Sequence, residues 1–191
     1  MAEDVTASID ATGLEDHHAS PHFLRRRGRT QRYQPWLKLA LVGDHRSHLL
    51  LSAVVARGPC NDAPLLPPAV RQACARAPIR RLLGDAAFDS EPHHRFCRQE
   101  LNIHRTIFPL NPRGHPSTVR GRYRQQLRHR FPQRLYGQRW QIESMISRLK
   151  RRLGDSLSAR RPETKNQEAL WRVIAYNCLL IALTKGFYRA L

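Results

Sequence analysis

The stretch YGQRWQIESMISRLK, residues Tyr136–Lys150, contains the most informative acidic residue of the chain, Glu143. Between Leu101 and Gly154 this glutamate is the only acid, whereas the same interval contains thirteen Lys and Arg residues. A lone carboxylate in a cationic surrounding is typical of a metal ligand beside a nucleic-acid backbone, because hard cations prefer oxygen ligands and basic side chains hold phosphates. Arg139 precedes Glu143 by four residues, so a simple helical ion pair is the alternative interpretation.

The spacing predicts a helix over Leu135–Leu153 that ends at Gly154. At about 100° per residue, four functional groups fall within roughly 60° of arc on one face, a stripe of about 21 Å: Tyr136, Arg139, Glu143 and Lys150. A phenol, a guanidinium, a carboxylate and an ammonium in line suit contact with a phosphodiester. Three further basic residues extend the stripe, and we predict that they contact DNA backbone rather than bases: Arg148, Arg151 and Arg152.

Charge supports a polyanionic partner. The 191 residues carry a net charge of +18, which excludes an ordinary neutral metabolic enzyme as the default class. The basic excess lies after residue 24, because residues 1–24 contain five acids and no Lys or Arg. A basic loop insertion is predicted at 14–34, where the cluster Arg25–Arg32 either grips DNA or is a solvated loop.

The order of predicted elements gives the fold class. Strands are predicted at Val5–Asp10, Trp36–Asp44, Ser47–Gly58, Ile79–Gly84 and Ile103–Leu110, the second and third forming a hairpin. Helices are predicted at Asp62–Ala77, Glu91–Leu101, Val119–Arg130, Leu135–Leu153 and Glu163–Tyr188, with an exposed loop at 111–118. This order resembles a ribonuclease-H-like α/β fold, a mixed sheet flanked by helices, in a single domain over 1–191.

Other features predict a cytoplasmic protein without a structural metal. The four cysteines have no metal or disulfide spacing, and the acidic N-terminus does not match a secretory signal. The histidine pairs His17–His18 and His93–His94, with Cys97, do not match zinc spacings, and the histidines are predicted to be solvated in loops or on a helix surface. In the last helix, an apolar stripe is predicted to pack in the core: Leu170, Ile174, Cys178 and Ile181.

The pattern Tyr136-x2-Arg139-x3-Glu143-x6-Lys150 resembles the Y-R-E-K signature of insertion-sequence DDE transposases. The family also has a D-x-x-[YF]-D pattern after a core strand, which RLLGDAAFDS at residues 81–90 matches with Asp85. TASIDATGL at residues 6–14 places the first aspartate of the family at Asp10, at the end of the opening strand. The element R-G-x-x-[NH]-D is similar to residues 57–62.

This resemblance implies a triad of Asp10, Asp85 and Glu143 that holds two Mg²⁺ or Mn²⁺ ions. It implies DNA strand cleavage followed by strand transfer, on transposon ends and target DNA, with a homodimer on DNA as an expected assembly and nucleoid association as the expected location. Tyr136, Arg139 and Lys150 would position the DNA backbone. Asp89 would either hold the loop that presents Asp85 or cap the following helix.

Nine residues precede Asp10, where members of this family carry a DNA-binding region. The chain is therefore interpreted as a catalytic core, a truncated element or half of a split product. Two alternatives stay open: a related hydrolytic nuclease, and a non-catalytic basic remnant of a transposable element whose DNA binding is salt-sensitive and independent of metal.

Overall fold

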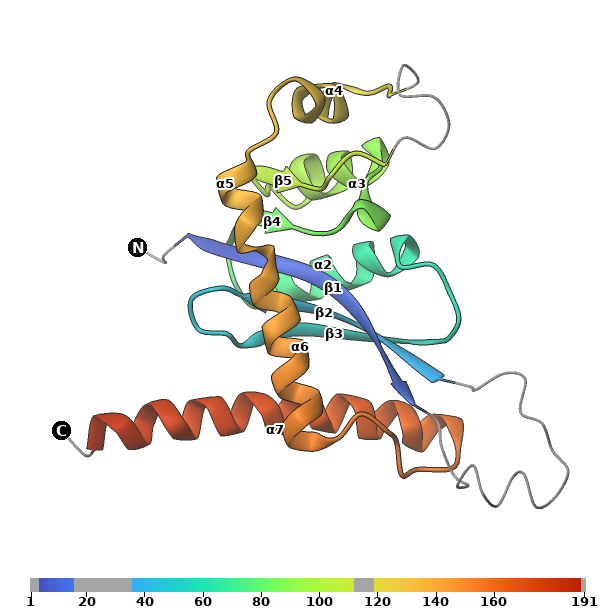
Figure 1. The fold of residues 1–191 in the computed structure, drawn as a ribbon, viewed down its shortest axis with the longest axis vertical. Coiled ribbons are helices and arrows are strands. Elements are labelled where there is room, and N and C mark those ends of the chain that lie inside the picture. The colour runs from blue at the N-terminus through green and yellow to red at the C-terminus, as the bar shows by residue number, and fades with distance from the viewer. Residues whose placement is uncertain (1–3, 16–35, 112–118, 190–191) are drawn as a thin grey trace, which may run out of the picture. The chain divides into compact units, whose positions relative to one another are not determined.

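The computed structural model describes residues 4–15, 36–111 and 119–189, with side-chain burial described as far as Thr184. Figure 1 shows a five-stranded sheet in the order β3-β2-β1-β4-β5. Its strands are β1 (Val5–Glu15), β2 (Trp36–Asp44), β3 (Leu50–Arg57), β4 (Ile79–Leu83) and β5 (Arg105–Ile107). β4 is parallel to both β1 and β5. The predicted hairpin is present as β2 and β3, which a tight turn joins.

Helical elements follow the predicted order. They are η1 (Ala63–Leu65), α2 (Leu66–Cys74), η2 (Ala86–Phe88), α3 (Glu91–Arg95), the π-helical η3 (Phe96–Glu100), α4 (Arg122–His129), α5 (Gln133–Tyr136), η5 (Gly137–Arg139), α6 (Trp140–Leu153) and α7 (Pro162–Arg189). A mixed sheet with helices confirms the predicted fold class, an α/β fold consistent with ribonuclease-H-like architecture.

Two boundaries differ from the sequence prediction. β1 does not end at Asp10 but continues to Glu15, so the start of the predicted loop 14–34 belongs to a strand. The extension is stabilised at its end, where Glu15 N–H donates to Asp155 O and Leu157 N–H donates to Glu15 O, both at 2.8 Å. The rest of that loop, with Arg25–Arg32 and His17–His18, and residues 112–118 lie outside the described residues.

The chain forms two compact units, and three strands run from one into the other. The first unit comprises 1–11, 40–54 and 61–146, and the second comprises 12–39, 55–60 and 147–191.

The core of the first unit lies between its strands and the helices α2 and η3. Ala7 and Ile9 of β1 are fully buried there with residues of β2, β4, α2 and η3. Because strand side chains alternate between faces, Ser8 and Asp10 lie on the opposite face of β1. At the end of β4, Gly84 leaves no room for a side chain: a Cβ atom would lie 2.9 Å from Ile9 Cγ2 and 3.0 Å from Phe108.

The first half of α6 packs on the sheet through Ile142 and Met145, which are both fully buried. Gly43 of β2 permits this contact, since a Cβ atom there would approach Met145 Sδ and lie 2.9 Å from Ile142 Cδ1. The close approach fixes the position of the first turn of α6, which carries Glu143.

Within the second unit, polar contacts hold α7 to the segment that connects α6 with α7. Arg172 donates to the carbonyl oxygens of Gly154 and Ser156 at 2.9 and 2.6 Å. Glu168 accepts from the N–H groups of Ser158 and Ala159 at 2.8–3.0 Å. Gly154 has a φ of +89°, which ends α6 as predicted.

The apolar stripe predicted for the last helix is wrong. Leu170, Ile174, Cys178 and Ile181 are all exposed, whereas the buried residues in the part of α7 up to Thr184 are Ala169, Val173 and Tyr176. Apolar residues occur all round this helix, so its sequence pattern alone does not indicate which face is covered. Within the described residues, no helix is long and apolar enough to cross a membrane.

Candidate active site

Asp10 lies in the middle of β1, and its side chain is 21% exposed. Its Oδ1 atom accepts a hydrogen bond from Ala11 N–H at 2.8 Å, which fixes the carboxylate. The pKa of Asp10 is raised to about 6, mainly because the side chain is buried and also because Asp85 and Glu143 are negative. The Ala11 N–H and the guanidinium of Arg139 act in the opposite direction. Three carboxylates from distant parts of the sequence therefore interact here.

Asp85 follows β4, as the sequence predicted. In the parallel β1–β4 pair, Ser8 lies opposite Leu83, so Asp10 and Asp85, each two residues further, come to neighbouring positions. Asp85 caps the 3₁₀ turn η2, and its Oδ1 atom accepts from Ala87 N–H at 2.8 Å. The register of the sheet thus brings the two aspartates together.

Glu143 lies in the first turn of α6, and its side chain is 51% exposed. Arg139 connects it to the strand: one guanidinium nitrogen donates to Glu143 Oε1, and Nη1 lies 3.9 Å from Asp10 Oδ2. The alternative interpretation of Arg139 and Glu143 as a helical ion pair is therefore also realised. Burial alone would lower the pKa of Arg139, but Tyr136, Glu143 and Asp10 raise it, so the guanidinium is charged.

The predicted continuous helix is interrupted before the site. Tyr136 ends α5, and Arg139 belongs to the 3₁₀ turn η5 that begins at Gly137. The interruption does not separate the groups, because the Arg139 guanidinium lies 6.0 Å from the centre of the Tyr136 ring. The first three members of the predicted stripe are thus in contact. Its remaining residues belong to the second unit: Arg148, Lys150, Arg151 and Arg152.

The three carboxylates Asp10, Asp85 and Glu143 are of the chemical type that binds divalent cations. Carboxylate oxygens are the preferred ligands of Mg²⁺ and Mn²⁺, and a buried carboxylate next to two others is stabilised by a cation. In the conformation described, Arg139 supplies the positive charge between Asp10 and Glu143. Within the described residues, no three metal-ligating side chains are arranged closely enough to hold one ion.

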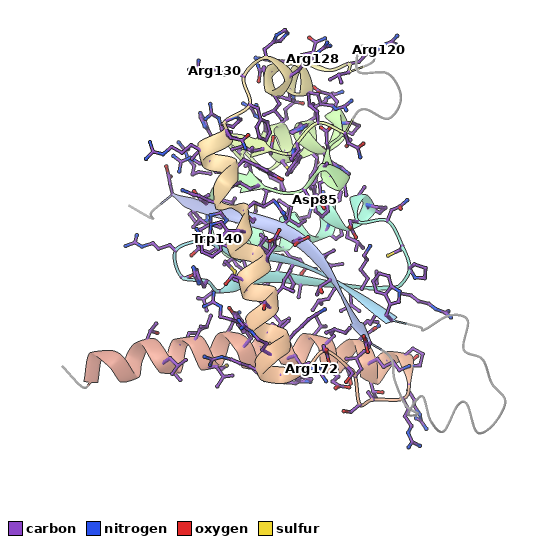
Figure 2. The ribbon with its side chains drawn as sticks, in the orientation of Figure 1. Asp85, Arg120, Arg128, Arg130, Trp140 and Arg172 are labelled. Carbon is purple, nitrogen blue, oxygen red and sulfur yellow. The ribbon has the colours of Figure 1, made fainter. Side chains whose placement is uncertain are left out.

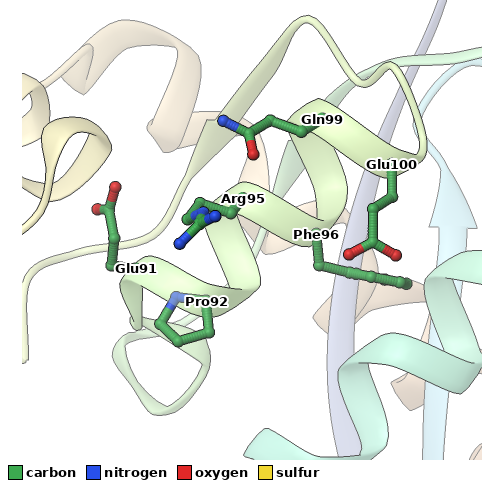
Figure 3. A pocket seen from close by; sticks show the side chains of 6 residues that line it. All are labelled: Glu91, Pro92, Arg95, Phe96, Gln99 and Glu100. Atoms are coloured by element: carbon green, nitrogen blue, oxygen red, sulfur yellow. The ribbon is translucent and has the colours of Figure 1, made fainter.

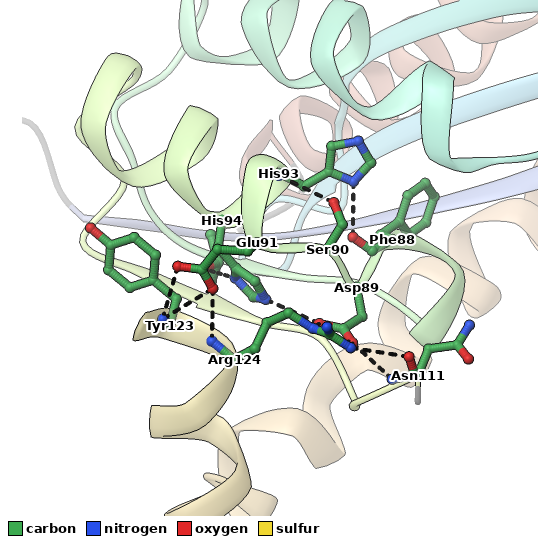
Figure 4. Close-up of polar contacts among 10 residues, drawn as sticks. Phe88, Asp89, Ser90, Glu91, His93, His94, Asn111, Tyr123 and Arg124 are labelled. Carbon is green, nitrogen blue, oxygen red and sulfur yellow. Dashed lines mark hydrogen bonds and ion pairs between the residues drawn. The ribbon is translucent and has the colours of Figure 1, made fainter. Parts of the chain in front are cut away.

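Asp89 is the centre of a second polar cluster, shown in Figure 4. Its carboxylate is fully buried and accepts from Arg124 Nε and Nη2 at 3.0 and 2.8 Å. It also accepts from Asn111 N–H at 2.8 Å, and His94 Nε2 lies 3.4 Å away. Burial alone would raise the pKa of Asp89, but the hydrogen bonds from His94, Arg124 and Asn111 and the charge of Arg124 hold it below its ordinary value.

The N-cap of α3 is Ser90, which accepts from His93 N–H, so Asp89 does not have the capping role. His94 is fully buried and hydrogen-bonds with Thr106 Oγ1 at 2.6 Å, so the prediction of a solvated histidine is wrong at this position. Sequence reasoning missed Arg124 because its partner lies 35 residues away. The only available signal was that Asp89 is one of few acids in a basic chain.

A pocket of ≈ 390 Å³ lies beside α3 and η3 rather than at Asp10 and Glu143 (Figure 3). Its lining residues are Glu91, Pro92, Arg95, Phe96, Gln99 and Glu100. Two of them, Glu91 and Gln99, also contact Tyr123 of α4. The pocket therefore adjoins the contact between α3 and α4.

The sheet has one carboxylate on β1, one shortly after the parallel strand β4 and a third on α6, which matches the class that the signature residues indicated. The chain belongs to the transposase DDE domain family, whose model matches residues 2–178. The predicted family is therefore confirmed, and the chain is a transposase domain. This family acts on DNA and generally uses divalent metal ions.

Proposed function

We propose that this chain cleaves DNA strands and transfers them to target DNA, with Asp10, Asp85 and Glu143 as the ligands of two Mg²⁺ or Mn²⁺ ions. The observation that supports this function is the register of β1 and β4, which brings Asp10 and Asp85 to neighbouring positions in the unit that also contains Glu143. They come from β1, the end of β4 and the first turn of α6, and a charged arginine joins two of them.

When bound, the two ions would neutralise the charge that develops on phosphorus and activate water or a 3′-hydroxyl. Two of the side chains have fixed positions, because Ala11 N–H donates to Asp10 and Ala87 N–H donates to Asp85. A bound cation would take over the positive charge that Arg139 supplies between Asp10 and Glu143. We infer that Arg139 is then available to hold a phosphate oxygen of the substrate.

The remaining basic residues would hold the DNA. Tyr136 lies beside Arg139, where its phenol can contact the backbone or stack. Lys150, Arg148, Arg151 and Arg152 are proposed to neutralise phosphates. We further propose that the protein works as a homodimer on transposon ends, in the cytoplasm at the nucleoid. Asp89 is proposed to hold the loop that presents Asp85, since η2 alone separates the two residues.

A non-catalytic DNA-binding remnant is the second candidate. The specific observation that favours it is the ion pair of Arg139 with Glu143, because a paired glutamate in the first turn of a helix requires no metal. This candidate predicts DNA binding that does not respond to divalent ions.

Titration with Mn²⁺ by calorimetry distinguishes the two candidates. We expect saturable binding to the wild-type chain in the presence of a short DNA duplex. The substitutions Asp85→Asn and Glu143→Gln should each weaken it about 100-fold or more, since each removes a charged ligand. Glu100→Gln is the matched control, because Glu100 is an exposed carboxylate of the same unit that pairs with Arg71 at 4.0 Å.

Equal binding by Glu143→Gln and Glu100→Gln would show that Mn²⁺ binds elsewhere. A folded wild-type chain that binds no Mn²⁺, even with DNA present, would overturn the catalytic proposal and favour the remnant.

A further inference from the structure

We propose that the segment from the end of α4 to α5 is a second DNA-binding surface of the first unit, held on the loop that carries Asp85. The surface consists of three exposed arginines, Arg128, Arg130 and Arg134, and we call it the α4 surface. The partner that we propose for this surface is a DNA duplex, and this choice of partner rests on the proposed function. Figure 2 shows Arg128 and Arg130 on the outside of α4, away from Asp85.

The charge of this surface is uncompensated. None of its three arginines has a carboxylate partner within the described residues, and no acidic residue occurs between Leu101 and Glu143. Cations at the end of a helix also interact with its dipole, which accounts for Arg128. Arg130 is the C-cap residue of α4, where the same dipole acts, whereas Arg134 lies in α5, a helix of only four residues.

The α4 surface leads directly to the candidate active site. Arg134 precedes Tyr136 by two residues, and Phe131 contacts the Tyr136 ring edge-on with centroids 5.2 Å apart. A chain extends at most about 3.5 Å per residue, so Arg134 lies within about 18 Å of Arg139. One DNA duplex is therefore long enough to contact Arg139 and Arg134 together.

A DNA-binding surface positions its substrate only if it is itself fixed to the catalytic residues. Two side chains of α4, Tyr123 and Leu127, are buried, and polar contacts add to their packing. Arg124 is the arginine of α4 that turns inward, where it binds the buried Asp89. Glu91 accepts from the N–H groups of Tyr123 and Arg124 at 3.1–3.2 Å, which anchors the first turn of α4 to α3.

The backbone at the start of α4 is adapted to this anchor. Gly121 has a φ of +104°, and a Cβ atom there would overlap with the Glu91 carboxylate. Asp89 in turn closes η2, since its N–H donates to Ala86 O at 3.2 Å. The inward contacts thus connect α4 to the turn that Asp85 caps, while the outward arginines face solvent.

The test compares two triple variants of the full chain. One combines Arg128→Gln, Arg130→Gln and Arg134→Gln. The control combines Arg71→Gln, Arg76→Gln and Arg80→Gln, which removes the same charge from exposed positions on and near α2 and β4. The affinity for a fluorescent DNA duplex is measured by anisotropy between about 50 and 200 mM salt.

We expect the slope of log affinity against log salt to fall by about 3 in the α4 variant and by less than about 1 in the control, because each phosphate contact contributes about 0.9. Equal losses in the two variants, or no loss in the α4 variant, would overturn the proposal. If the triple variant does not fold, Arg134→Gln alone should lower the slope by about 1, with Arg80→Gln as its control.

Mn²⁺ titration of the same proteins keeps the two proposals separate. The α4 variant should bind Mn²⁺ as the wild type does. An α4-dependent slope without any Mn²⁺ binding would leave the surface established and the catalytic function refuted. Normal Mn²⁺ binding with an unchanged slope would refute the α4 surface alone.

Discussion

Replacing Glu143 with glutamine is expected to lower the rate of DNA strand cleavage by about 10³-fold or more while leaving the protein folded. The substitution keeps the shape of the side chain but removes the charge that a metal ligand requires. It also frees Arg139 from its nearest carboxylate. Because the Glu143 side chain is half exposed, its ion pair contributes little to stability. The measurement is nicking of supercoiled plasmid in the presence of Mn²⁺.

The matched control is Glu100→Gln, which neutralises an exposed, arginine-paired carboxylate that the catalytic proposal does not use. It should cleave at the wild-type rate. If Glu143→Gln cleaves within about tenfold of the control, Glu143 is not a metal ligand. If the wild type itself does not cleave or join DNA, the remnant is the better description of the protein.

The second large effect concerns stability. Asp89→Asn is expected to lower the free energy of unfolding by about 3 kcal/mol, because it leaves the charge of Arg124 without its buried partner. It also replaces one of two acceptor oxygens by an NH2 donor, although both oxygens of Asp89 face donors from Arg124. Denaturant unfolding measures the loss. Asp4→Asn is the control, since Asp4 pairs with Arg80 at 3.3 Å on the surface and should contribute at most about 1 kcal/mol.

The stability that Asp89 provides should depend on pH in one direction. Its pKa is lowered in the folded state, so the stabilisation is fully present above the ordinary value of 3.8 and is lost as pH falls below it. The difference in unfolding free energy between wild type and Asp89→Asn should therefore shrink in acid and stay constant near neutral pH. A difference that does not change in acid would show that Asp89 stabilises the fold without its charge.

The sequence contained enough to predict the family, the fold class and the order of the elements. Asp85 was placed correctly after its strand because a short apolar run bounded by Gly84 is a strong local signal. Asp10 was placed at a strand end, whereas β1 continues, because the end of that strand is stabilised by residues 155–157. Such pairing over 140 residues leaves no trace in local sequence pattern.

Contacts across long separations account for the other differences. The burial of His94 depends on Asp89 and Thr106, and only the first of these was near in sequence. Arg124 points inward, whereas the other arginines of α4 are exposed. Residue type alone does not distinguish these two positions. The roles of Asp10, Asp85, Asp89 and Glu143 stay predictions until the variants are measured.

The division of the chain has a consequence for how this gene tolerates deletion. The second unit is assembled from three separate segments, so residues 147–191 are not a removable module. An early stop codon near Ser147 would delete α7 but keep the strand ends Thr12–Glu15 and Trp36–Leu39, which contain the buried Leu14 and Leu39. Apolar strand ends that have lost the rest of their unit favour aggregation. A chain that ends near Ser147 is therefore expected to aggregate rather than to fold as an independent first unit.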